Sequence, residues 1–84
     1  MHEGALCREI MEIVGEEALV HDIKKVYEIV LRVGPYSCVH EEQMNFYFDI
    51  LGKGTCMEHA RIVIEKDESI QGISQMYIKT FRGE

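Results

Sequence analysis

The stretch VYEIVLRV at residues 26–33, followed directly by Gly34 and Pro35, decides the fold. Its side chains alternate with a period of two, which is the pattern of a β-strand. One predicted face carries Tyr27, Ile29, Leu31 and Val33, and the other carries Glu28, Val30 and Arg32. The Gly-Pro pair is a turn signal, so we expect the strand to end at Val33.

An amphipathic helix is predicted on each side of this strand. Residues 4–19 place apolar side chains in a helical stripe and line the other side with glutamates. Residues 41–51 repeat the pattern with Met44, Tyr47 and Phe48, and the glycines at 52 and 54 end it.

Two further strands are expected at residues 61–65 and 76–81, joined by a polar loop at 66–75 that is long enough for a hairpin. The order is therefore α-β-α-β-β. Both helices must cover one sheet face if a single core is to form, which predicts an α/β (α+β) fold: a two-layer sandwich with a three-stranded mixed sheet. Residues 1–84 form one domain in this interpretation. If the first two strands are parallel, the second helix is the crossover between them.

Composition excludes several classes of function. Lys and Arg number 9 against 15 Asp and Glu, giving a net charge of −6, so no nucleic-acid partner is expected. The apolar runs are too short for a membrane span, and charged residues interrupt the N-terminus where a signal peptide would need an apolar core. The expected location is cytoplasmic, with no membrane partner.

Cysteine and histidine usage gives little sign of a site. Cys7, Cys38 and Cys56 form no Cys-x-x-Cys pair, and we interpret each as a small buried side chain. His21 and His59 lie at predicted connections, where solvated imidazoles are usual, and so does His40. No phosphate loop, nucleophile elbow or zinc-protease motif is present, so the chain is not expected to be an enzyme.

The N-terminus combines metal ligands by covalent geometry alone. Met1 offers an α-amine, and His2 offers an amide nitrogen and an imidazole, so fused chelate rings can form. Glu3 could supply the fourth ligand. A planar nitrogen field of this kind favours Ni(II) or Cu(II) over Zn(II), and the sequence does not distinguish the first two.

Several segments resemble the HypA/HybF family of nickel metallochaperones. They are Met1-His2-Glu3, Glu16-Glu17-Ala18, residues 30–34, Ser37-Cys38-Val39, Phe46-Tyr47-Phe48, Gly54-Thr55 and residues 60–65. The resemblance implies Ni(II) binding by Met1, His2 and Glu3 for maturation of [NiFe] hydrogenase, with urease as a second recipient. It also implies a nickel-delivering GTPase and a nickel-enzyme precursor as partners. Family members often carry an acidic residue where His40 stands, which makes His40 or Glu41 a candidate to orient a metal ligand through a hydrogen bond.

One departure from the family is large. Members insert a zinc domain with two Cys-x-x-Cys pairs between the last two strands, and residues 66–75 contain no such insertion, so a structural zinc is not expected. An alternative follows from this loss, in which the domain serves as a protein-interaction scaffold or a homo-oligomerising subunit without metal transfer.

Overall fold

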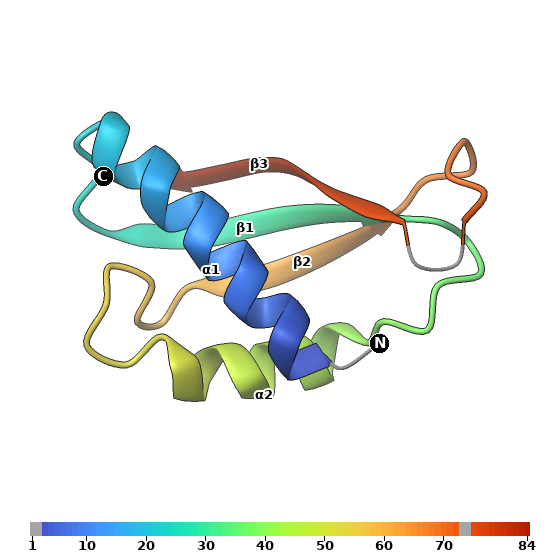
Figure 1. Cartoon of the computed structure of the whole chain (residues 1–84), viewed down its shortest axis with the longest axis horizontal. Coiled ribbons are helices and arrows are strands. Elements are labelled where there is room, and N and C mark those ends of the chain that lie inside the picture. The colour runs from blue at the N-terminus through green and yellow to red at the C-terminus, as the bar shows by residue number, and fades with distance from the viewer. Residues whose placement is uncertain (1–2, 73–74) are drawn as a thin grey trace.

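The computed structural model describes residues 3–72 and 75–84. Two helices and three strands follow one another in the predicted order (Figure 1). They are α1 at Glu3–Val20, β1 at Val26–Val33, α2 at Glu41–Leu51, β2 at Arg61–Lys66 and β3 at Met76–Gly83. The predicted α+β sandwich is confirmed. Among the described residues, no helix is both long and apolar enough to cross a bilayer.

The sheet is mixed, with the strand order β2-β1-β3. Strand β1 pairs in parallel with β2 and antiparallel with β3. The hairpin expected between the last two strands is therefore wrong, because β3 passes to the far side of β1. The physical reason is that side chains of α2 occupy the outer edge of β2, which leaves the free edge of β1 for β3.

A β-bulge changes the predicted facing of one aromatic residue. The register with β3 shifts between Val26 and Glu28, which leaves Tyr27 as an extra residue on β1. Tyr27 is consequently 38% exposed instead of lying on the inner face. Its hydroxyl donates to the side chain of Glu84 at the end of the chain.

One core joins both helices to the sheet. Helix α1 crosses the sheet face, and α2 lies beside it along the β2 side (Figure 1). The buried side chains come from every layer: Leu6, Cys7, Ile10, Val14 and Ala18 of α1, Met44 and Phe48 of α2, and Ile29, Leu31 and Ile62 of the sheet.

Helix α2 also covers the outer edge of β2 through hydrogen bonds. The side-chain amide of Asn45 donates to the Ile62 carbonyl at 2.9 Å and accepts from the Ile62 N–H at 2.8 Å. The carboxylate of Glu41 accepts from the Ile64 N–H at 2.8 Å. These side chains occupy backbone groups that a further strand would otherwise use.

The loop after β2 crosses the end of β1 closely. A Cβ added to Gly34 would lie 2.6 Å from the carbonyl oxygen of Ile70, so only glycine fits there without a backbone shift. The Asp67 N–H donates to the Val33 carbonyl at 2.7 Å, which fixes the start of the loop on the same strand end.

Candidate metal site at the start of the first helix

Glu3 is the first described residue of the predicted metal site, and it begins α1. One of its carboxylate oxygens accepts a hydrogen bond from the backbone N–H of His40 at 3.1 Å. The carboxylate also lies where the positive end of the helix dipole favours negative charge. Residues 37 positions apart in sequence thus meet at this point. Met1 and His2 lie outside the described residues.

His40 immediately precedes α2 and has an extended backbone. Its carbonyl accepts from the Met44 N–H at 3.0 Å, so both the N–H and the carbonyl of His40 are hydrogen-bonded. The His40 side chain is exposed. The structure therefore brings the His40 backbone to Glu3. Whether the imidazole takes part in metal binding stays a prediction.

Glu41 does not join this pair within the described part of the chain. Its carboxylate is engaged by the Ile64 N–H of β2, as described above. That bond gives Glu41 a role at the sheet edge. Its role beside the metal ligands stays a prediction.

Cys38 corrects one interpretation made from the sequence. Cys7 is buried and Cys56 is half-buried, but Cys38 is exposed, on the segment that leads to His40. Ser37 shapes this segment, since its N–H donates to the Gly34 carbonyl at 3.1 Å and its hydroxyl accepts from the Val39 N–H at 3.2 Å. A place in a polar connection just after a Gly-Pro pair was the signal that could have indicated exposure.

Burial sets the chemistry of Cys7. It raises the pKa of the thiol to about 11, and the nearby charge of Glu3 acts in the same direction. Cys7 therefore stays protonated at neutral pH and is a poor metal ligand, because metals bind the thiolate.

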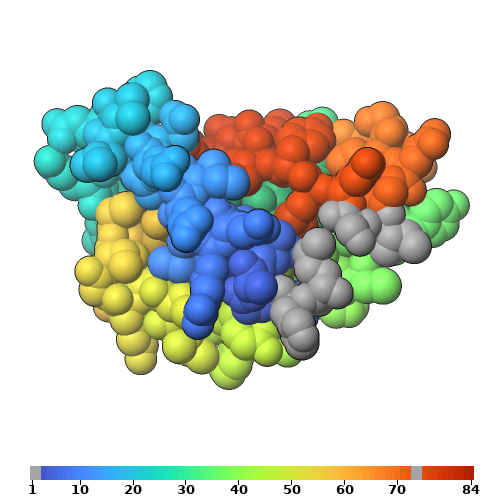
Figure 2. All heavy atoms as spheres, in the orientation of Figure 1, coloured from blue at the N-terminus to red at the C-terminus, as the bar shows by residue number. Residues whose placement is uncertain are grey.

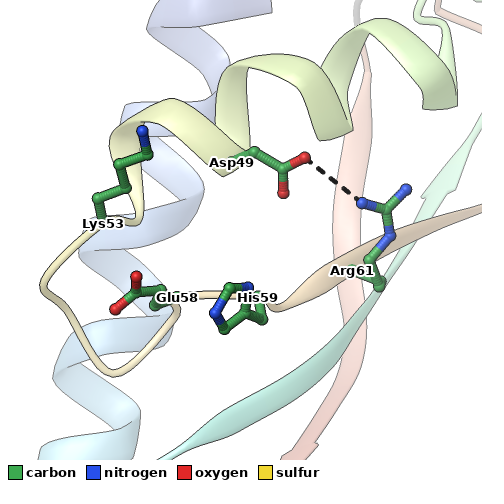
Figure 3. Close-up of a pocket in the computed structure, with 5 residues that line it drawn as sticks. All are labelled: Asp49, Lys53, Glu58, His59 and Arg61. Atoms are coloured by element: carbon green, nitrogen blue, oxygen red, sulfur yellow. Dashed lines mark ion pairs between the residues drawn. The ribbon is translucent and has the colours of Figure 1, made fainter.

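A second polar region lies at the other end of α2. Five side chains line a depression of about 480 Å³: Asp49, Lys53, Glu58, His59 and Arg61 (Figure 3). Asp49 and Arg61 pair at 3.6 Å, and Glu58 accepts from the Gly54 N–H at 3.4 Å. Because its charges of both signs are already partly engaged, this depression has no evident ligand.

No group of three or more His, Cys, Asp or Glu side chains converges on a metal position within residues 3–72 and 75–84. The imidazoles of His21, His40 and His59 are all exposed, as predicted from their place at connections.

The fold and the hydrogen bond between Glu3 and His40 define a class of protein. It is a small α+β domain in which the first residue of α1 is bonded to the residue that precedes α2. Residues 1–72 match the family described as "Hydrogenase/urease nickel incorporation, metallochaperone, hypA". The chain belongs to this HypA family.

Known relatives agree with this assignment. The hydrogenase maturation factor HypA of Actinobacillus succinogenes is 44% identical over 62 residues, which are 74% of this chain and 55% of that protein. HypA of Escherichia coli K12 is 32% identical over 69 residues, covering 82% of this chain and 60% of that protein. This chain thus matches little more than half the length of either relative.

The fold comparison is consistent with the sequence comparison. The solution structure of the Ni metallochaperone HypA from Helicobacter pylori superimposes with a TM-score of 0.75 at 13% identity, over 99% of this chain and 97% of that chain. At this identity the likeness supports the fold alone.

Proposed function

We propose that this chain is a nickel-binding metallochaperone that holds Ni(II) through Met1, His2 and Glu3 and passes it to a nickel-enzyme precursor. The supporting observation is the bond between Glu3 and His40, in a chain that belongs to the HypA family. The hydrogen bond holds the first helical turn against the start of α2. The proposed ligands would then extend from a fixed base.

The proposed ligands suit Ni(II). An α-amine, a deprotonated amide and an imidazole form the planar nitrogen field that Ni(II) accepts readily. Glu3 uses one carboxylate oxygen for His40, and in the proposed site the other oxygen ligates the metal or accepts from a metal-bound water. The ligands proposed at the chain terminus suit release of the metal as well as its capture.

The proposed recipient is the precursor of [NiFe] hydrogenase, with urease as a second recipient, and the proposed metal source is a GTPase. The location that fits these partners is the cytoplasm. The chain would act as a single nickel domain, since residues 66–75 hold no Cys-x-x-Cys pair and no structural zinc is expected.

Calorimetric titration of Ni(II) into untagged protein tests the site. We expect one Ni(II) per chain, and at least tenfold weaker binding for His2→Ala and for a chain whose Met1 α-amine is acetylated, because each change removes one of the proposed chelating nitrogens. His59→Ala, which changes an exposed imidazole in the polar depression, is the matched control and should bind as wild type does.

Two Glu3 variants separate ligation from positioning. Glu3→Gln keeps an oxygen that can accept from the His40 N–H but removes the charge, whereas Glu3→Ala removes both. If the carboxylate is a ligand, both variants weaken Ni(II) binding. If it only positions the helix, Glu3→Gln binds as wild type does.

Equal Ni(II) binding by wild type, His2→Ala and the acetylated chain would refute the terminal site. Recovery of the same partners by wild type and His2→Ala, together with that result, would favour the scaffold function instead.

A further inference from the structure

A shallow groove runs between the two helices, directly beside Glu3. It has a volume of about 430 Å³ and is lined by Gly4, Ala5 and Arg8 of α1 and by Tyr47, Ile50 and Leu51 of α2. Figure 2 shows the surfaces of α1 (blue) and α2 (yellow-green) meeting on this side of the molecule. We call this feature the α1/α2 groove.

Two large apolar side chains of α2 are exposed here: Ile50, which lines the groove, and Phe46, which lies outside the groove lining. Phe46 is 60% exposed and Ile50 is 53% exposed, although both belong to a helix whose other face is fully buried. Their spacing of four residues places them next to each other on the helix surface. Neighbouring exposed apolar side chains of this size are typical of interaction sites.

The charges of the molecule are divided between its two layers. Helix α1 carries five glutamates and one arginine, and α2 carries three carboxylates and no cation, so the helical layer has a charge of −7. The three strands together carry five cations and two carboxylates, a charge of +3. The α1/α2 groove therefore lies in a strongly acidic layer, although Arg8, a cation, is among the residues that line the groove itself.

Several of these acidic groups have no cation to neutralise them. Glu12 and Glu16 follow Arg8 at four-residue intervals along α1, and Glu42 precedes Phe46 by the same interval on α2. None of these three carboxylates has a Lys, Arg or His partner within 4.0 Å in the part of the chain that the structure describes.

The sheet cations, by contrast, are largely paired. Lys79 and Arg32 both contact Glu65, at 3.3 and 3.2 Å, and these two contacts hold the pKa of Glu65 below its usual range. Arg82 pairs with Glu28 at 3.4 Å. The electrostatic attraction for a partner thus comes from the helical layer.

Charge selects among the possible occupants. The helical layer repels nucleic acid, anionic lipid and the equally acidic helical layer of a second copy. What it attracts is a basic surface, and what fills a groove between two helices is an amphipathic helix. We propose that the α1/α2 groove docks a helix of a partner protein that carries an apolar stripe flanked by Lys or Arg. The partner class rests on the proposed function, because metal transfer needs a docking surface near the metal, and this one begins at Gly4.

A metal-free experiment tests the groove separately from nickel binding. The probe is a synthetic helical peptide of about 18 residues with Leu at the i, i+3, i+4 and i+7 positions and Lys on both flanks. It is titrated into isotopically labelled protein and followed by the amide shifts in NMR spectra. We expect shifts confined to residues 4–16 and 42–51, and binding that weakens as salt is raised.

Matched double variants make the test specific. Phe46→Ser with Ile50→Ser should weaken peptide binding about tenfold or more. The control is Leu19→Ser with Val20→Ser, which changes two apolar residues at the far end of α1. These residues are 83% and 76% exposed, and their replacement should leave peptide binding unchanged. Glu12→Gln with Glu42→Gln, which preserves the apolar surface, should weaken binding and reduce its salt dependence.

Three results would overturn the proposal: no binding, shifts on the sheet, or equal binding by the two serine variants. The proposal would also be overturned if wild type sediments as a dimer and the Phe46→Ser, Ile50→Ser variant sediments as a monomer, since a second copy would then occupy the groove. None of these results would affect the calorimetric test of Ni(II) binding.

Discussion

At the residue scale, Cys7 couples the core to pH. Its thiol is fully buried and lies 3.5 Å from the Met44 carbonyl, and its pKa is raised from 9.0 to about 11. The folded state therefore favours the protonated thiol more than the unfolded state does. That contribution is complete below the unfolded pKa near 9 and is lost as the pH rises toward 11.

We expect the free energy of unfolding of wild type to fall faster between pH 9 and 11 than that of Cys7→Ala. The extra slope should approach about 1.4 kcal/mol per pH unit. Urea denaturation at several pH values measures it. Cys38→Ala, which changes the exposed thiol, should follow wild type, and parallel curves for wild type and Cys7→Ala would contradict the prediction.

The sequence predicted the role of single residues where a periodic pattern or a backbone requirement determines them. Leu31 and Phe48 are buried as their spacing indicated. Tyr27 and Cys38 were predicted wrongly, because a bulge and an irregular connection set their exposure and neither has a period. The bond between the Glu3 carboxylate and the His40 N–H joins distant residues, so no local pattern could predict it.

At the element scale, one buried amide makes two of the hydrogen bonds that join α2 to β2. Asn45 is only 5% exposed, and its side chain makes the two hydrogen bonds to Ile62 described above. Its replacement by alanine would leave a buried N–H and a buried carbonyl without partners. Each such group costs about 1–3 kcal/mol.

We therefore expect Asn45→Ala to lower the free energy of unfolding by about 3 kcal/mol, measured by chemical denaturation. Gln43→Ala is the matched control, because it removes an exposed amide from the same helix and should change stability by less than about 0.5 kcal/mol. A similar loss in both variants would show that the edge contact contributes little.

The elements themselves were predictable, and their pairing was not. Hydrophobic periodicity indicated all five elements to within two residues at either end. The hairpin between the last two strands was wrong because a short loop allows a hairpin without requiring one, and because side chains of α2 already occupy the outer edge of β2. The position of Asn45 facing the β2 edge depends on the same long-range pairing.

At the scale of the whole molecule, the last strand completes a core that the rest of the chain cannot close. Met76, Ile78 and Phe81 pack against the buried cluster, and Lys25 and Glu84 exchange backbone hydrogen bonds of 2.8 and 2.9 Å. Without β3, one side of the apolar central strand would be open to water.

We expect a chain of residues 1–72, the segment that matches the family, to lose its cooperative thermal transition in circular dichroism. As a control, about ten Gly and Ser residues inserted between Gln71 and Gly72 should preserve the transition and cost only about 1 kcal/mol, because loop length enters the closure entropy weakly. Cooperative unfolding of the shortened chain would show that β3 is dispensable.

The passage of the 67–72 loop over Gly34 has a mechanical consequence. A domain inserted in this loop would be attached through β2 and β3, which lie on opposite sides of β1 and therefore about 10 Å apart. Two separated anchors resist twisting better than a single hinge does. The loop itself lies against Gly34, the first residue of the connection that runs to His40. A displacement of this loop would therefore reach the connection whose last residue, His40, is hydrogen-bonded to Glu3.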